Sequence, residues 1–163
     1  MRILIVYGSR RDGTRGLAVL IAAALAERGL QTRVRLAGPL IELDEVDAVI
    51  VAGALYLGRW HRDAVRFVRH HARMLRRLPL WLVSSDTVEE ISVGGHHQVR
   101  QVARLAASVG ARGQVTFGGH ARLDPHGPLA GAMVGALAGN DRDPAAVRHW
   151  AATVAAELAP NPV

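Results

Sequence analysis

The chain begins with the segment Ile3-Leu4-Ile5-Val6-Tyr7-Gly8-Ser9-Arg10-Arg11-Asp12-Gly13-Thr14-Arg15, in which an apolar strand pattern passes through a short polar turn into a helix pattern. Where a buried parallel strand ends, backbone N–H groups and the positive end of the next helix dipole converge on one spot. Ser9 and Thr14 add hydroxyl donors to this turn, and Arg10, Arg11 and Arg15 add positive charge. The segment therefore predicts a strand-turn-helix unit that binds a monophosphate group.

The turn differs from the two familiar nucleotide-binding signatures. The strand is not followed by Gly-x-Gly-x-x-Gly, the signature of a dinucleotide site, or by Gly-Lys-Ser/Thr, that of a nucleoside triphosphate site. Considered alone, the turn leaves two interpretations open. It is either a phosphate cradle or an ordinary turn in which Ser9 or Asp12 caps the helix.

Length and composition predict one domain, residues 1–163. Half of the 163 residues are hydrophobic and only 4% are aromatic, so the core must consist of Ala, Val, Leu and Ile, as in helices packed on a parallel sheet. The chain has no cysteine, which excludes disulfides and thiolate metal sites. The strand pattern follows Met1 directly, without the form of a signal peptide, so we expect a cytoplasmic protein.

The chain is basic, with a formal net charge of +6 and a pI near 11.3. All 20 of its Lys and Arg residues are Arg, and in a chain rich in Ala and Gly this is typical of a coding bias. A positive field also favours an acidic protein partner or an anionic membrane surface, so membrane association is left open. Nucleic acid is not expected as a partner, because the aromatic residues that stack on single-stranded bases are missing.

Hydrophobic periodicity alternates between strand and helix along the chain, which predicts an α/β protein with a doubly wound parallel sheet. We expect strands at 2–7, 32–36, 48–52, 80–84 and 114–117; helices are expected at 14–28 and 62–77, at a segment that carries Val99 and Val102 and ends at Gly110, and from Pro144 with Asp143 as its N-cap. In such a sheet, ligands bind at the carboxyl ends of the central strands. The connections at 86–95 and 118–142 are long for this architecture, and long loops are often functional.

Helix 62–77 carries a stripe of arginines on its expected outer side: Arg62, Arg66, Arg69, Arg73 and Arg76. The stripe is either a solvated face or a docking surface for an anionic partner. We assign no catalytic residue, because the chain shows no nucleophile-base order or carboxylate pair suited to acid-base work. We also assign no metal site, since no two histidines have the i, i+4 spacing of a helical site.

Four segments, taken in order along the chain, resemble flavodoxin-like FMN proteins. They are Tyr7-Gly8-Ser9-Arg10-Arg11-Asp12-Gly13-Thr14, Gly53-Ala54-Leu55-Tyr56-Leu57-Gly58-Arg59-Trp60-His61, Phe117-Gly118-Gly119 with Arg122-Leu123-Asp124-Pro125, and Arg142-Asp143 ahead of Trp150-Ala151. Within that superfamily the chain looks most like the menaquinone-linked protoporphyrinogen dehydrogenase group. The resemblance implies a flavodoxin-like five-stranded parallel sheet of order 2-1-3-4-5, with helices on both faces.

The resemblance also implies where FMN would bind. The phosphate would lie on the first turn, at Ser9, Arg10, Arg11, Asp12, Gly13 and Thr14. The flavin ring would be held by two later loops, at Ala54, Leu55, Tyr56, Leu57, Gly58 and Trp60, and at Ser84, Ser85 and Asp86. Tyr56, Leu57 and Trp60 offer the flat apolar surfaces that an isoalloxazine ring needs. The alternative is that Tyr56 and Trp60 are core residues that cover the edge of the sheet.

By resemblance, the expected function is that of an FMN-dependent oxidoreductase in heme biosynthesis. It would pass electrons from a reduced, porphyrinogen-like substrate to a quinone or another acceptor. The alternative is a non-enzymatic electron carrier that docks to an acidic partner, and a third class is a scaffold without a cofactor. The sequence leaves open whether the chain forms a homo-oligomer.

Overall fold

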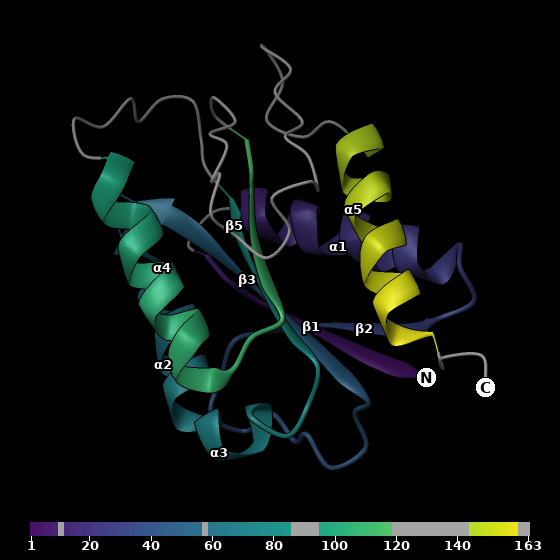
Figure 1. The fold of residues 1–163 in the computed structure, drawn as a ribbon, viewed down its shortest axis with the longest axis horizontal. Coiled ribbons are helices and arrows are strands. Elements are labelled where there is room, and N and C mark those ends of the chain that lie inside the picture. Colours follow the sequence, from purple (N-terminus) through teal and green to yellow (C-terminus); the bar gives the residue numbers. More distant parts are fainter. Residues whose placement is uncertain (10–11, 57–58, 86–94, 119–143, 160–163) are drawn as a thin grey trace.

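The computed structural model describes residues 1–9, 12–56, 59–85, 95–118 and 144–159 (Figure 1). Its strands are β1 (Arg2–Gly8), β2 (Gln31–Leu36), β3 (Ala48–Tyr56), β4 (Arg59–Trp60), β5 (Leu80–Ser85) and β6 (Gly113–Phe117). Its helices are α1 (Asp12–Ala26), α2 (Arg62–His70), α3 (Ala72–Leu75), α4 (Gly95–Val109) and α5 (Pro144–Leu158).

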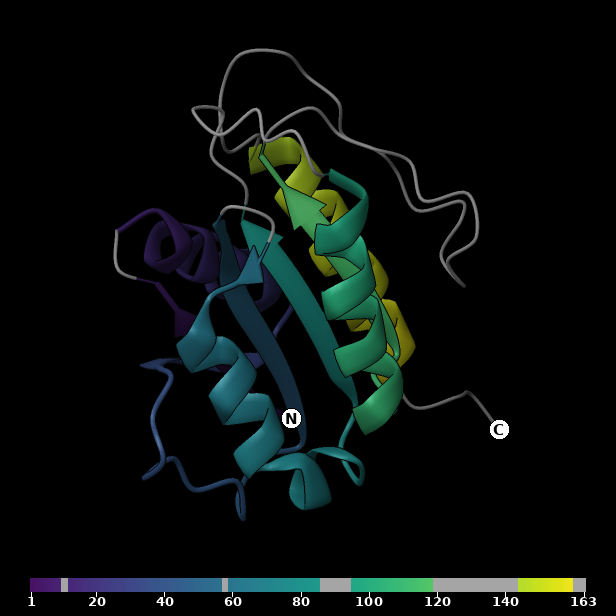
Figure 2. The same ribbon diagram turned by 90° about the vertical axis from the view of Figure 1, so that its left-hand side faces the viewer.

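The sheet has the predicted doubly wound topology. Its parallel strands lie in the order β2-β1-β3-β5-β6, which is the expected 2-1-3-4-5 order once the short β4 is set aside. Helices α1 and α5 cover one face, and α2, α3 and α4 cover the other (Figures 1 and 2). The predicted fold class is therefore confirmed.

Two apolar layers hold the helices on the sheet, and alternation along the strands builds both of them. In β1, Ile3 and Ile5 pack under α1 and α5, whereas Leu4 and Val6 pack under α2 and α4. The residues of β3 from Ala48 to Gly53 are all buried, as expected for a central strand with helices on both sides. These buried strands carry the residues of the candidate site at their carboxyl ends.

The structure corrects the predicted end of the third strand. We expected it to end at Ala52, but β3 continues to Tyr56 because Gly53 and Ala54 pair with Ser84 and Ser85 of β5. Beyond this point the chain turns back as β4, which pairs antiparallel with β3 and was not predicted. A segment that we expected to be a loop is therefore the end of a strand and a short hairpin.

The predicted helix 62–77 is interrupted at His71, which separates α2 from α3. Both the backbone nitrogen and the ring Nδ1 of His71 lie 3.0 Å from the carbonyl oxygen of Phe67. His71 has φ −97° and ψ 12°, outside the helical region. The ring thus shares an acceptor with the helix ladder at the residue where the helix is interrupted.

The amino end of the sheet carries the acidic connection between β2 and β3. The backbone nitrogen of Arg2 donates to Asp47 at 2.6 Å, and the Arg2 guanidinium lies 3.0 Å from Glu45. These carboxylates thus bind the start of β1, at the edge opposite to the strand ends that form the candidate site. The long connections 86–94 and 119–143, and the expected N-cap Asp143, lie outside the described residues.

Within the described part of the chain, no helix has the length and apolar character needed to cross a membrane.

Candidate functional site

The carboxyl ends of β1, β3 and β5 lie side by side in the sheet. Gly8 of β1 is in register with Gly53 of β3, which in turn is in register with Ser84 of β5. Three segments leave the sheet from this row: the turn into α1, the β3–β4 hairpin, and the chain after Ser85. The structure therefore brings the three predicted loops to one edge, although sequence alone keeps them far apart.

The turn after β1 leads directly to the amino terminus of α1. This helix begins at Asp12, two residues before the expected start at Thr14, so the first-turn N–H groups lie close to the edge of the sheet. Such groups have no partner within their own helix and favour an anion. Thr14 is only 2% exposed, Ser9 and Gly13 are half-buried, and Arg10, Arg11 and the side chain of Asp12 lie outside the described residues.

The β3–β4 hairpin is the second part of the site. Leu55 is paired with Trp60 and Tyr56 with Arg59, and the backbone nitrogen of His61 donates to the Ala54 carbonyl at 2.8 Å. Leu55 points into the core, whereas Tyr56 is 46% exposed. Tyr56 is thus the aromatic residue of the hairpin that remains open to a ligand. Leu57 and Gly58 lie outside the described residues.

Trp60 does not take the position that we expected. Its side chain is 2% exposed, and its indole Nε1 donates to the Gly53 carbonyl at 3.0 Å. A Cβ added at Gly53 would overlap Cε2 and Nε1 of the indole, so the ring covers Gly53 closely. The alternative interpretation is the right one for this residue: Trp60 is a core residue that folds the hairpin back on the sheet. Its indole is buried against Gly53 and offers no exposed face.

Gln101 of α4 also holds this hairpin, and we did not predict it. Its side-chain Oε1 accepts a hydrogen bond of 2.9 Å from the backbone nitrogen of Trp60. The backbone nitrogen of Trp60 needs such a partner, because among the described strands β4 pairs with β3 alone. No sequence signal marks Gln101, since a single half-buried glutamine on a helix is common.

We expect the Gln101→Ala substitution to loosen the hairpin. The substitution leaves the partly buried backbone N–H of Trp60 without its acceptor. Such a loss typically lowers the free energy of unfolding by about 1 kcal/mol. Urea denaturation measures this loss. Gln101→Glu is the matched control, because its carboxylate can still accept the bond; equal losses in both variants would contradict the role of the acceptor.

The start of α2 connects the first two loops. His61 is the N-cap of α2, and its Nδ1 accepts from the backbone nitrogen of Asp63 at 3.3 Å. Ala64 in the first turn lies so close to Gly8 that a Cβ on Gly8 would lie 2.7 Å from the Ala64 nitrogen. In the sequence, His61 directly precedes the expected helix 62–77, and this position is the signal that could have identified it as the N-cap. Helix α2 therefore contacts the end of β1 and follows directly from β4.

The third part of the site is the end of β5. Ser84 is buried and Ser85 is half-buried, and each lies in register with a small residue of β3. The row Gly8, Gly53 and Ser84 is itself buried, whereas Ala54 and Ser85, one residue further along β3 and β5, are half-buried. Asp86, the remaining expected residue of this loop, lies outside the described residues.

Comparison with known proteins agrees with this architecture. Residues 4–127 match the flavodoxin domain family, which is more than half of the chain, and the protein belongs to this family. Proteins of this family are FMN-binding flavoproteins, so the expected cofactor is confirmed at the level of the family. The chain is accordingly a flavodoxin-like redox protein.

Individual relatives refine the comparison. The chain is 30% identical over 92 residues to protoporphyrinogen IX dehydrogenase [quinone] of Escherichia coli strain K12, a match that covers 54% of this chain and 50% of that protein. The match thus spans about half the length of that curated relative. Among solved structures, a mutant of flavodoxin from Pseudomonas aeruginosa is 19% identical, with a TM-score of 0.62, and covers 97% of this chain and 99% of its own. A flavodoxin of Streptococcus pneumoniae TIGR4 is 20% identical, with a TM-score of 0.62, and covers 97% of this chain and 100% of its own. These two structures support the fold alone.

Proposed function

We propose that this protein is an FMN-dependent oxidoreductase that takes electrons from a reduced, porphyrinogen-like substrate and passes them to a quinone or another acceptor. The observation that carries the proposal is the convergence of three segments at one sheet edge: the α1 amino terminus, the β3–β4 hairpin and the end of β5. The match to protoporphyrinogen IX dehydrogenase [quinone] supports the choice of substrate class. In this function, residues 1–163 would form one domain.

The residues at this edge fit the phosphate end of FMN. The first-turn N–H groups of α1, together with the hydroxyls of Ser9 and Thr14, would hold the phosphate, and Arg10 and Arg11 would add charge. Gly13 in the first turn has no side chain that would shield these N–H groups. Asp12 would add negative charge to the same turn, and Arg10 and Arg11 would offset it.

The hairpin and the end of β5 would hold the ring of FMN. Tyr56 offers an exposed flat face, and the half-buried residues Ala54 and Ser85, with Ser84 beneath them, would lie beside the pyrimidine edge. Leu55 and Trp60 would act from beneath, by packing the hairpin on the core. Bound FMN would supply the redox chemistry itself, and the protein would bind it, orient it and exclude water from it.

The alternative function is that of a non-enzymatic electron carrier. Exposed arginines along α2, α3 and α4 favour it, because a positive surface steers an acidic redox partner. Turnover separates the two hypotheses. An enzyme oxidises a porphyrinogen steadily when menaquinone is supplied, whereas a carrier exchanges electrons once per bound cofactor and then stops.

We expect Thr14→Val to weaken the binding of FMN by about tenfold, which corresponds to one lost hydrogen bond to a charged group. The substitution keeps the volume of a buried side chain, so the fold should remain intact. Quenching of flavin fluorescence measures the affinity. Riboflavin, which lacks the phosphate, is the control ligand, and its affinity should not change; unaltered FMN binding in the variant would argue against this phosphate position.

A further inference from the structure

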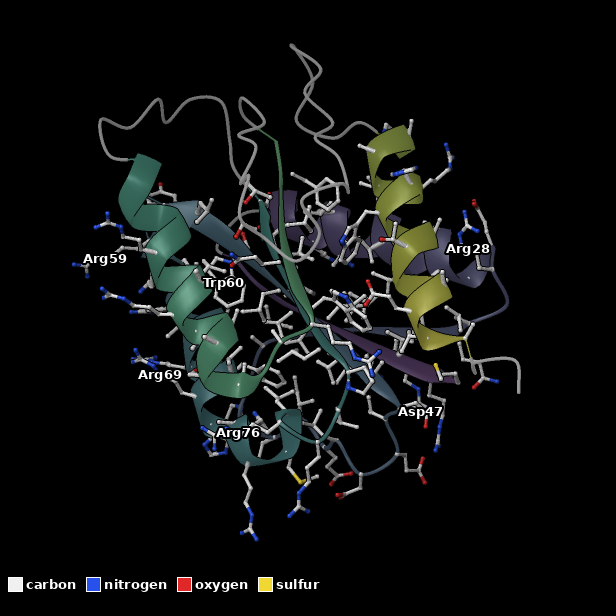
Figure 3. All side chains as sticks on the ribbon, viewed as in Figure 1. Arg28, Asp47, Arg59, Trp60, Arg69 and Arg76 are labelled. Carbon is white, nitrogen blue, oxygen red and sulfur yellow. The ribbon has the colours of Figure 1, made fainter. Side chains whose placement is uncertain are left out.

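The outer surface of α2, α3 and α4 carries a cluster of exposed arginines that the cofactor site does not use. We name it the arginine face and define it by Arg59, Arg62, Arg66, Arg69, Arg73, Arg76, Arg100 and Arg104. Helices α2 and α4 lie side by side over the same face of the sheet (Figure 2). In Figure 3, Arg59, Arg69 and Arg76 project outward on this side of the molecule, and Arg28 lies on the opposite side.

Within the part of the chain that the structure describes, few carboxylates compensate this charge. Among the described residues, Asp63 is the carboxylate that pairs with the arginine face, at 3.6 Å from Arg62 and 3.9 Å from Arg66. The acidic connection between β2 and β3 instead binds Arg2 at the amino end of the sheet. Among the described residues, this acidic connection and the arginine face therefore lie apart, and most arginines of the face have no carboxylate within salt-bridge distance.

The chemistry of the face indicates its partner. The centre of a protein–protein interface is typically apolar and rich in aromatic anchors. The exposed large hydrophobic side chains of the described residues lie elsewhere, at Met1, Val19, Leu36 and Leu40, with Tyr56 at the hairpin. A membrane surface that contains acidic lipids needs no such centre, because its headgroups attract each arginine separately.

The position of Tyr56 gives a second argument. It is half-exposed in the β3–β4 hairpin, where it is paired with Arg59 at one end of the arginine face. Tyrosine is enriched at the level of lipid headgroups, since its ring is apolar and its hydroxyl is polar. The arginine face and the hairpin thus form one continuous surface. Its residue types, arginines with an exposed tyrosine at one end, are those of a protein surface that contacts a membrane.

We propose that the arginine face docks the protein on an anionic lipid surface, with the β3–β4 hairpin at the boundary with the headgroups. Docking in this orientation places the edge of the candidate site next to the bilayer, where a lipid-dissolved quinone resides. This last consequence depends on the proposed function. The docking itself does not, because it requires neither FMN nor a substrate.

Sedimentation with vesicles tests the proposal. The full chain should bind phosphatidylcholine vesicles that contain about one third phosphatidylglycerol, remain free with pure phosphatidylcholine, and be released by high salt. The triple variant Arg69→Gln, Arg73→Gln and Arg104→Gln should bind the anionic vesicles at least about tenfold more weakly. These three side chains are exposed. None of them holds the hairpin on α4, because the acceptor of that hydrogen bond is Gln101. The circular dichroism spectrum of the variant should therefore match that of the parent.

A matched variant separates the surface from the net charge. Arg28→Gln, Arg33→Gln and Arg35→Gln remove the same charge from exposed positions outside the arginine face, and this variant should bind as the parent does. Equal losses in both variants, or no binding to anionic vesicles, would overturn the proposal. Retention on immobilised polyglutamate without vesicle binding would assign the face to an acidic protein instead. Failure to bind FMN with vesicle binding intact would refute the proposed function alone.

Discussion

The Gly53→Ala substitution is expected to lower the free energy of unfolding by about 3 kcal/mol, because overpacking of a buried site has costs of this size. The added Cβ would occupy the volume of the Trp60 indole, which is itself buried and bonded to the Gly53 carbonyl. To make room, the indole must leave its place, and the hairpin must move with it. Urea denaturation gives the free energy, and a titration with FMN shows whether the altered hairpin still binds the cofactor.

A control and a double variant make this prediction specific. Gly38→Ala should change stability by no more than about 0.5 kcal/mol, because the added Cβ meets only the Leu36 carbonyl oxygen at 4.0 Å. In a Trp60→Leu background, Gly53→Ala should cost much less than in the parent, since a smaller side chain leaves room for the methyl group. If Gly53→Ala and Gly38→Ala are equally stable, or if the cost is the same in both backgrounds, the proposed contact between Gly53 and Trp60 is wrong.

The second large effect is expected at Gly8, the last residue of β1. Its added Cβ would lie 2.7 Å from the backbone nitrogen of Ala64 and 3.2 Å from its Cα. Backbone in the first turn of α2 cannot move away as the end of a side chain can, so Gly8→Ala must shift the helix. We expect a loss of about 2 kcal/mol in the free energy of unfolding.

Gly8→Ala should also weaken FMN binding, because Gly8 directly precedes Ser9 and the phosphate turn. Thermal unfolding with and without FMN separates the two effects. A variant that loses stability but keeps the full shift in melting temperature with FMN would show that α2 does not position the turn. Gly38→Ala serves again as the control, and we expect it to keep both properties.

The strands, helices and layers of this protein are largely predictable because apolar periodicity specifies them. The uniformly apolar segment at 48–52 predicts a central strand, and the pattern Pro144 to Leu158 predicts the helix that packs beside α1. Parallel strands with helical connections allow few arrangements, so the 2-1-3-4-5 order follows from a resemblance to one family.

The hairpin was less predictable, since its form depends on contacts that no local pattern encodes. Trp60 belongs to a segment that we expected to contact the ligand. Because Gly53 has no side chain, there is room for the indole to turn inward and pack on the sheet. Its second support, Gln101, is 41 residues away in sequence. The break at His71 was not predicted either, and it coincides with a contact between the His71 ring and the Phe67 carbonyl that the apolar pattern does not encode.

A comparison of FMN with riboflavin tests the central claim, which is that the turn after β1 and the start of α1 bind the phosphate of a flavin mononucleotide. The two ligands have the same ring and differ in the phosphate. We predict that the purified protein quenches the fluorescence of FMN, shifts its visible absorption bands, and binds riboflavin at least about tenfold more weakly, as expected for several hydrogen bonds to a charged group. Absence of FMN binding, or equal affinity for both ligands, would contradict the account.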